Sequence, residues 1–223
     1  MTLAPDAVRT MFDRIAPVYD AMNRVMTAGL DGRWRRLAAE RAVRPGDRVL
    51  DAACGTGDLA VACLRAGAGR VTGLDFSERV LERARVKAPS VEWVQGDLLA
   101  LPFGDESFDA ATVGFGIRNV ADLPLALREL RRVLRPGGRL AILEITQPRG
   151  ALKPFFGLWF DRVVPVLGRA LPGGGAYGYL PQSVKRFPDA ERLAALAREA
   201  GFAQVDFQLL AGTIVAVHVG VAA

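Results

Sequence analysis

From residue 48 onward, strand-like and helix-like segments alternate along the chain, and this alternation constrains the fold more than any other feature. Short apolar runs of the strand type are separated by longer amphipathic segments of the helix type. The predicted strands are 48–52, 70–75, 91–97, 108–115 and 139–145, and the predicted helices between them are 56–67, 77–88 and 122–138. Strand–helix–strand units at this spacing predict an α/β fold, with a parallel sheet and right-handed crossovers.

Residues at the ends of these segments support the assignment. Ser77 and Asp122 precede helical runs as N-caps, and Gly137 with Gly138 ends the helical segment predicted over 122–138. The C-terminal part then breaks the pattern, because the runs 203–210 and 213–222 are joined only by Ala211 and Gly212. So tight a turn requires antiparallel pairing. We therefore expect a mostly parallel seven-stranded sheet that ends in an antiparallel hairpin, with helices on both faces.

The composition describes one globular domain over residues 1–223, since 51% of the residues are hydrophobic and 24% are charged. Two regions lie outside the alternation: an N-terminal helical region, 1–43, and an insertion, 147–187, rich in aromatic residues, proline and glycine. No apolar run reaches the roughly 18 residues of a membrane-spanning helix, and the N-terminus has no signal-peptide core. We predict a cytoplasmic protein.

Cysteine and histidine are too scarce for a disulfide framework or a zinc site, because Cys54, Cys63 and His218 are the full set. We predict no metal site, and His218 in an alternating strand is not expected to be catalytic. The net charge of +5 is compatible with nucleic acid, with anionic lipid or with no specific partner. The arginine-rich stretches 33–36 and 128–132 are interpreted as solvated helix faces.

The stretch VLDAACGTGDLA, Val49 to Ala60, places a glycine-rich turn between a strand and a helix. Such a turn lets backbone N–H groups and the helix N-terminus approach a ligand closely. The letters GTGDLA match G-x-G-x-x-A, and Asp75 follows Gly55 by twenty residues, so a dinucleotide site remains an alternative.

Three details favour S-adenosylmethionine (SAM) over a dinucleotide. Asp51 at a strand end suits the cationic amino group of a methionine moiety and does not suit a pyrophosphate. Asp97 closes the third strand, where an adenine amino group needs an acceptor. The predicted hairpin also departs from an all-parallel dinucleotide fold. Because the carboxyl ends of parallel strands converge, we expect Asp51, Asp75 and Asp97 to reach one ligand.

Together with these segments, several others resemble the UbiE/COQ5 family of quinone-biosynthesis C-methyltransferases. The specific matches are FDRIAPVYDAMN near the N-terminus, GFGIRNV after the fourth strand and YLPQSVKRFP before the last helix. The resemblance covers nearly the whole chain. It implies a class I SAM-dependent methyltransferase (Rossmann-like) fold and methyl transfer from SAM to a ring carbon of a polyprenylated quinol. Reduced demethylmenaquinone, a naphthoquinol that becomes menaquinol, is the first expectation. A ubiquinone-pathway benzoquinol and an RNA substrate are the alternatives, in that order.

Site residues follow from the resemblance and from strand-end positions. The expected cofactor-binding residues are Asp51, Gly55, Thr56, Gly57, Asp75, Phe76, Asp97, Leu98 and Gly114. The expected catalytic, substrate-side residues are Tyr19, Asp20, Arg118 and Asn119. Gly114 stands where some relatives have serine, so only its backbone can contact the cofactor.

A quinol carbon becomes nucleophilic when the neighbouring hydroxyl loses its proton. A phenol without assistance has a pKa of about 10, so it keeps this proton at neutral pH. Arg118 is therefore expected to stabilise the developing phenolate or to hold a basic water. The oxidised quinone cannot react in this way.

The insertion 147–187 carries an apolar run with basic flanks, including Lys153, Arg162 and Arg169. It fits a polyprenyl channel with peripheral contact at the inner face of the membrane, or alternatively packing on the sheet or a homodimer interface.

Three other functions are alternatives to a quinol methyltransferase. A nucleic-acid methyltransferase acting on amino groups would typically carry a proline-aromatic motif where this chain has GFGIRNV, so no nucleic-acid partner is expected. The acid pattern opposes a dehydrogenase. Tyr19 and Arg118 argue against a noncatalytic SAM-binding module.

Overall fold

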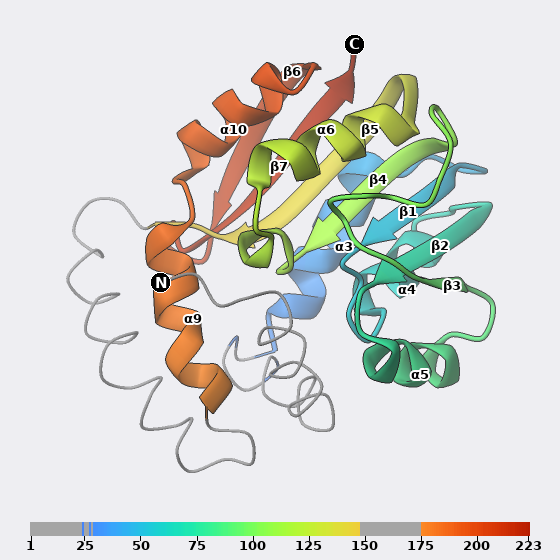
Figure 1. The fold of residues 1–223 in the computed structure, drawn as a ribbon, viewed down its shortest axis with the longest axis horizontal. Coiled ribbons are helices and arrows are strands. Elements are labelled where there is room, and N and C mark those ends of the chain that lie inside the picture. Colours follow the sequence, from blue (N-terminus) through green and yellow to red (C-terminus); the bar gives the residue numbers. More distant parts are fainter. Residues whose placement is uncertain (1–23, 25–26, 28, 148–174) are drawn as a thin grey trace.

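The structure is a computed structural model that describes residues 24, 27, 29–147 and 175–223 (Figure 1). The predictions for Tyr19 and Asp20, and for most of the N-terminal region and the insertion, lie outside the described residues. Within the described part the helices are α3 (Asp31–Ala42), α4 (Asp58–Arg65), α5 (Glu78–Lys87), the 3-10 helix η1 (Ile117–Asn119), α6 (Leu123–Val133), α9 (Gly175–Arg186) and α10 (Ala190–Glu199).

Seven strands form one mixed sheet in the order β3-β2-β1-β4-β5-β7-β6. The strands are β1 (Arg48–Ala52), β2 (Arg70–Asp75), β3 (Glu92–Gln95), β4 (Phe108–Gly114), β5 (Leu134–Ile145), β6 (Phe202–Leu210) and β7 (Val215–Ala222). The first five strands pair in parallel, and β7 pairs antiparallel with both β5 and β6. The predicted seven-stranded sheet with a terminal antiparallel hairpin is confirmed.

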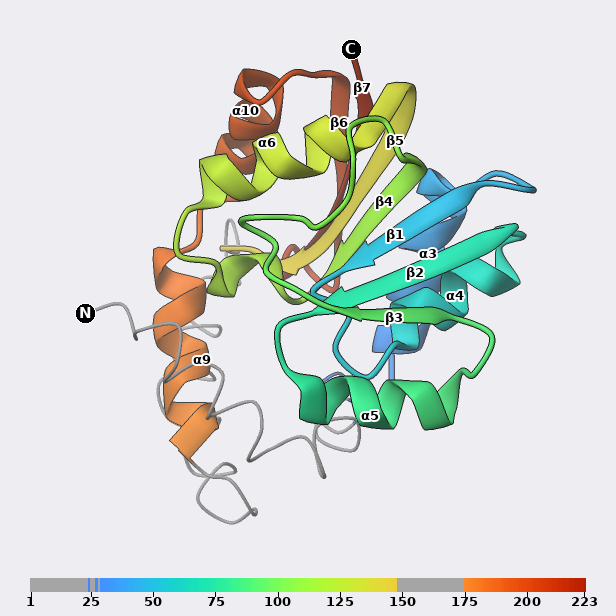
Figure 2. The same cartoon turned by 45° about the vertical axis from the view of Figure 1, so that its right-hand side comes forward.

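Two apolar cores cover the two faces of the sheet. One joins α6 and α10 to alternate residues of the central strands, such as Leu50 and Ile142. The other joins α3 and α4 to the intervening residues, such as Val49 and Leu143. Figure 2 shows α6 and α10 on one side of the sheet and α3 and α4 on the other. The strands alternate between these cores because successive side chains point to opposite faces.

The capping predictions hold at the starts of two helices. The Ser77 hydroxyl accepts the Val80 N–H at 3.3 Å, and an Asp122 carboxylate oxygen accepts the Leu125 N–H at 2.9 Å. The predicted end of the helix over 122–138 is wrong, because α6 ends at Val133. Leu134 is extended and pairs with Phe108 on β4, which starts β5 ahead of the two glycines.

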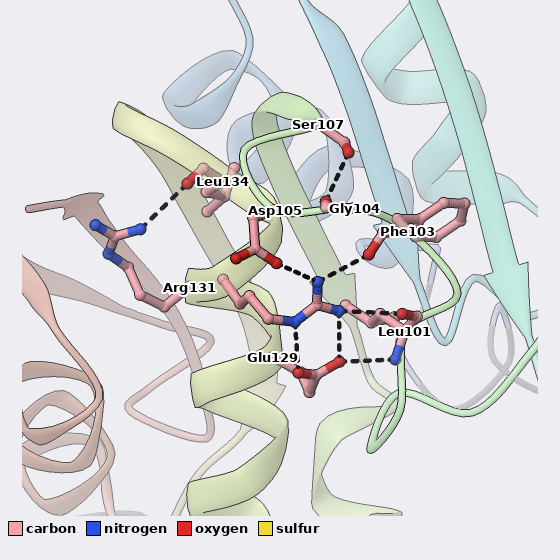
Figure 3. Close-up of polar contacts among 9 residues, drawn as sticks. Leu101, Phe103, Gly104, Asp105, Ser107, Glu129, Arg131 and Leu134 are labelled. Carbon is pink, nitrogen blue, oxygen red and sulfur yellow. Dashed lines mark hydrogen bonds and ion pairs between the residues drawn. The ribbon is translucent and has the colours of Figure 1, made fainter.

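The loop between β3 and β4 is attached to α6 by Arg132. The guanidinium donates two hydrogen bonds to Glu129, at 2.7 and 2.8 Å, and others to the Leu101 and Phe103 carbonyls and to Asp105. Figure 3 shows Glu129, Leu101, Phe103 and Asp105 gathered in this network. The planar fork of an arginine suits such multiple contacts. In this way α6 fixes the chain that leads from β3 back into the sheet.

Trp93 of β3 packs directly over two glycines. A Cβ atom at Gly73 would lie 2.3 Å from a carbon of the Trp93 ring, and one at Gly57 would lie 2.4 Å from another. The indole N–H of Trp93 donates to the Ala88 carbonyl at 3.1 Å, which fixes the ring. Only glycine leaves room for the indole at these two positions.

We therefore predict that Gly73→Ala lowers the unfolding midpoint by at least about 3 °C, since overpacking a core typically costs about 1–3 kcal/mol. Gly104→Ala is the matched control, because a Cβ atom there has its nearest neighbour at 3.6 Å. Thermal unfolding followed by circular dichroism measures both variants. Adding Trp93→Leu should recover part of the loss. Equal midpoints for Gly73→Ala and the unmodified protein would show that the indole moves aside at no cost.

Candidate functional site

An open pocket lies where the carboxyl ends of β2, β1 and β4 meet, with a volume of about 740 Å³ that includes solvent at its mouth. Parallel strands bring their carboxyl-end loops to one edge of the sheet, which places ligand sites there. Of the residues predicted from the sequence, those that line the pocket are Asp51, Gly55, Thr56, Asp75, Phe76, Gly114 and Asn119. Within the described residues, Gly57, Asp97, Leu98 and Arg118 do not line it.

Asp51 is the most deeply buried acid of the pocket, with no exposed surface. Its Oδ1 accepts the Thr112 hydroxyl at 2.9 Å, and its Oδ2 has no hydrogen-bond partner among the described residues. Burial raises the pKa of Asp51 to about 7, because a charged carboxylate is poorly solvated there. A buried carboxylate oxygen without a donor is a binding position for a cation or an N–H group.

Asp75 connects the end of β2 to the glycine turn after β1. Its Oδ2 accepts the Gly55 N–H at 2.9 Å, and its Oδ1 accepts the Ser77 N–H at 3.0 Å. A carboxylate only accepts hydrogen bonds, and it has about four acceptor positions, so hydroxyl donors of a ligand suit such a group.

The glycine turn itself leads into the N-terminus of α4. Gly55 and Gly57 have positive φ of 56° and 86°, and Gly57 is the N-cap of the helix. From α5, the Lys87 ammonium donates to the Thr56 hydroxyl at 3.1 Å and to Asp58 at 2.7 Å. Gly57 therefore shapes the turn and accommodates Trp93, and it does so without lining the pocket.

The loops after β1 and β4 touch each other where they line the pocket. Ala53 and Phe115 both have positive φ, at 51° and 58°, a conformation that residues other than glycine rarely adopt. A Cβ atom at Gly116 would lie 2.7 Å from the Cβ of Ala53, so this contact also requires a glycine. Strained backbone of this kind concentrates at ligand sites.

Asn119 and Arg118 are neighbours in η1 with different surroundings. Asn119 lines the pocket, and its buried Oδ1 has no partner among the described residues. Arg118 instead forms a buried ion pair: its Nη1 donates to Glu144 at 2.8 Å and to the Phe115 carbonyl. Burial raises the pKa of Glu144, and the charge of Arg118 opposes that shift. Sequence reasoning missed Glu144, which lies 26 residues from Arg118.

Asp97 and Leu98 lie outside the pocket because β3 is the edge strand beyond β2. Asp97 is exposed, and its Oδ1 accepts the Leu99 N–H at 2.9 Å. Leu98 is 5% exposed and belongs to the apolar core under α6. Their assignment to the cofactor remains a prediction.

Arg35 of α3 corrects the prediction that the arginines of residues 33–36 form a solvated face. Arg33 and Arg36 are exposed, whereas Arg35 is 7% exposed and lines the pocket. Arg35 lies three and four residues before Ala38 and Ala39, both of which are fully buried. This helical spacing was the signal that places Arg35 on the buried face of α3.

His218 has a structural environment. It is buried on β7, packs against Phe207 with ring centres 5.3 Å apart, and lies 2.8 Å from the Ala190 carbonyl oxygen. Burial lowers the pKa of this imidazole. In the described part of the chain there is no group of three or more His, Cys, Asp or Glu side chains placed to hold a metal ion.

Solved structures show the same fold at low sequence identity. The cyclase SpnF superposes with a TM-score of 0.73 at 21% identity, over 96% of this chain and 94% of that one. A SAM-dependent methyltransferase from Thermotoga maritima, described as a possible histamine N-methyltransferase, gives 0.65 at 24% identity, over 96% of this chain and 100% of that one. These likenesses confirm the predicted fold class.

Sequence relatives are considerably closer. The demethylmenaquinone methyltransferase of Thermus thermophilus is 47% identical, over 94% of this chain and 99% of the relative. The 2-phytyl-1,4-naphtoquinone methyltransferase of Synechococcus elongatus is 44% identical, over 94% and 95%. UbiE of Paracoccus denitrificans, a ubiquinone/menaquinone biosynthesis C-methyltransferase, is 43% identical, over 96% and 89%.

A sequence model of the ubiE/COQ5 methyltransferase family matches residues 1–222. This match confirms the resemblance inferred from the motifs, the prediction of an enzyme and the prediction that SAM is the cofactor. The chain belongs to the ubiE/COQ5 methyltransferase family.

Proposed function

We propose that this protein is a SAM-dependent C-methyltransferase that converts reduced demethylmenaquinone, a prenylated naphthoquinol, to menaquinol. The relatives from Thermus thermophilus and Deinococcus radiodurans, each 47% identical, are demethylmenaquinone methyltransferases and support this acceptor. The observation that carries the proposal on the structural side is the pocket at the carboxyl ends of β2, β1 and β4, with its buried and partly unpartnered Asp51 carboxylate.

The residues of this pocket fit SAM. Asp51 would bind the ammonium of the methionine portion, since its Oδ2 lacks a donor. Asp75 would accept the ribose hydroxyls, with Phe76 beside it along the pocket wall. The backbone of the glycine turn, with Gly55 and Thr56, would lie along the cofactor.

The remaining predicted cofactor residues have supporting roles in this proposal. Gly57 gives the turn its shape, and Gly114 offers only its backbone. Asp97 and Leu98 would lie toward the adenine end, beyond β2. When bound, SAM supplies an electrophilic methyl group on a sulfonium.

Activation of the acceptor falls to the residues after β4. Asn119 presents a buried oxygen without a donor to the pocket, which suits the hydroxyl of a quinol. Arg118 follows the same strand but does not line the pocket, so its fixed charge would favour the phenolate form of that hydroxyl through space, without direct contact. Glu144 keeps the guanidinium in place through the buried ion pair. The proposal retains Tyr19 and Asp20 as further substrate-side residues from outside the described part.

A benzoquinol of the ubiquinone pathway is the second candidate acceptor. UbiE of Paracoccus denitrificans, 43% identical, carries both ubiquinone and menaquinone biosynthesis in its name. Both acceptors present a phenolic hydroxyl next to a ring carbon, so the same residues after β4 would serve either one.

A prenylated acceptor resides in a membrane, and the insertion 147–187 carries apolar and basic residues suited to a membrane surface. In the described part of the chain, no helix is long and apolar enough to cross a bilayer. We therefore propose peripheral contact at the inner face of the membrane, with a homodimer interface as the competing role of this segment. Co-sedimentation with anionic vesicles at low salt distinguishes them, because a dimer interface alone gives none.

The function is tested by mass spectrometry after incubation with methyl-labelled SAM and each reduced acceptor separately. We expect the label on the naphthoquinol ring, in higher yield than on the benzoquinol, and none on the oxidised quinones. A label on neither quinol, with SAM binding shown independently, would rule out the proposed acceptors.

Asp51 predicts an unusual pH dependence. Its pKa is about 7 in the folded protein and 3.8 ordinarily, so the fold loses stability as pH rises from about 4 to 7. Asp51→Asn removes this penalty and should raise the unfolding midpoint of the unliganded protein at pH 7.5 by about 2 °C or more, with little change near pH 4.

The carboxylate of Asp51 must ionise to bind the ammonium of SAM. The affinity for SAM, measured by calorimetry, should therefore fall at least about fivefold between pH 7.5 and 5.5 in the unmodified protein. A SAM affinity that does not change with pH would contradict the assignment of Asp51 to the ammonium.

Arg118→Ala should lower the methyl-transfer rate more than tenfold while SAM affinity stays within a few-fold. Because this change leaves Glu144 buried and unpaired, the double variant Arg118→Ala/Glu144→Gln is measured beside it. Arg192→Ala is the control, since Arg192 forms an exposed ion pair with Glu199. Unchanged turnover in a folded Arg118 variant would remove this residue from the mechanism.

A further inference from the structure

Arg35 is a charged residue of the pocket wall to which the assignments above give no role. Among the described residues that line the pocket, three are acids, Asp51, Asp58 and Asp75, and Arg35 is the single cation. The side chain of Arg35 is 8% exposed, so its position is set by contacts within the protein. A buried cation that lines a ligand pocket is suited to bind an anionic group of the ligand.

Two contacts hold the Arg35 guanidinium. Its Nη1 donates to Asp31, one turn earlier in α3, and the other oxygen of Asp31 accepts the Thr27 hydroxyl at 3.1 Å. The guanidinium carbon lies 5.3 Å from the centre of the Phe115 ring, itself part of the pocket wall. A carboxylate on one side and an aromatic ring on another restrict the rotamers of a long side chain. Arg35 is therefore preorganised for a ligand.

These contacts leave most of the guanidinium donors unused. An arginine has five N–H donors, and within the described part of the chain neither Nε nor Nη2 of Arg35 donates a hydrogen bond to the protein. The charge of Arg35 also acts on Asp51, where it partly offsets the effect of burial on the carboxyl pKa. A cation and an anion thus line the same pocket and lie close enough to interact.

We propose that Arg35 binds the carboxylate of the methionine portion of SAM while Asp51 binds the adjacent ammonium. The amino-acid end of SAM is a zwitterion, so it needs one anionic and one cationic group close together. Lys87, the other cation near the glycine turn, is engaged by Thr56 and Asp58 and does not line the pocket. Arg35 meets the requirement.

This inference rests on the SAM site and is independent of the proposed quinol acceptor. The carboxylate of SAM is unchanged by methyl transfer, so Arg35 should stabilise substrate, transition state and product equally. Losing such a contact raises the KM for SAM and leaves kcat within a few-fold. Direct binding measurements test it without any acceptor, so failure of the quinol proposal would not affect the result.

The experiment is isothermal titration calorimetry with two ligands, SAM and decarboxylated SAM, which lacks only the carboxylate. Arg35→Gln should raise the Kd for SAM about tenfold or more and leave the Kd for decarboxylated SAM within about twofold. Arg35→Lys keeps the charge and loses the planar fork of the guanidinium. Its Kd for SAM should lie between those of the unmodified protein and Arg35→Gln. Arg36→Gln is the matched control, because Arg36 is the next residue and is exposed.

Arg35→Gln leaves Asp31 buried without its partner, so Asp31→Asn/Arg35→Gln is titrated in parallel to separate folding from binding. Equal weakening of both ligands in the folded variants would overturn the proposal, since it would mean that Arg35 only supports the pocket wall. Unchanged SAM affinity would overturn it as well. Should neither variant fold, the unmodified protein decides: similar affinity for the two ligands overturns the proposal, and at least tenfold preference for SAM supports it.

Discussion

The pocket depends on one contact between neighbouring strands, in which the Asp75 carboxylate at the end of β2 accepts the backbone N–H of Gly55 after β1. Without this restraint the glycine turn would be a flexible loop, because glycine has wide backbone freedom. Lys87 and Trp93 restrain the same turn from outside, through Thr56 and through close packing on Gly57. The backbone groups that approach the cofactor are therefore fixed before it binds, which lowers the entropic cost of binding.

Several features of this pocket reduce stability in the absence of a ligand. Asp51 is buried with one unpartnered oxygen, Asn119 has another, and Ala53 and Phe115 hold positive φ. Each is unfavourable in an isolated protein, and the first two become favourable when a ligand supplies the missing donors. The pairing of Arg118 with Glu144 is different, since each of these buried charged groups already has a partner in the protein. The site thus contains two kinds of group: polar atoms that lack a partner until a ligand binds, and an ion pair that is already complete.

Local signals in the sequence were sufficient for most of the fold. Every strand and helix predicted between residues 48 and 145 is present, the caps Ser77 and Asp122 are confirmed, and the short link before β7 predicted its antiparallel pairing correctly. The end of α6 was wrong because Leu134 pairs with Phe108, a contact that helical periodicity does not contain. The site was predicted in part: seven of the residues expected there line the pocket, since strand-end positions converge wherever the strands are parallel.

Neighbours within a few residues specify the parallel sheet, its terminal hairpin, the glycine turn and the acids at the strand ends, so these features can be predicted from the amino-acid order. Which of these groups meet depends instead on tertiary packing. The order of the strands separates Asp97 from the pocket, and the packing of α3 on the sheet brings Arg35 into it. It also pairs Arg118 with Glu144 across 26 residues. Such contacts depend on how whole elements pack, and side-chain spacing along one segment carries no information about the element on the other side.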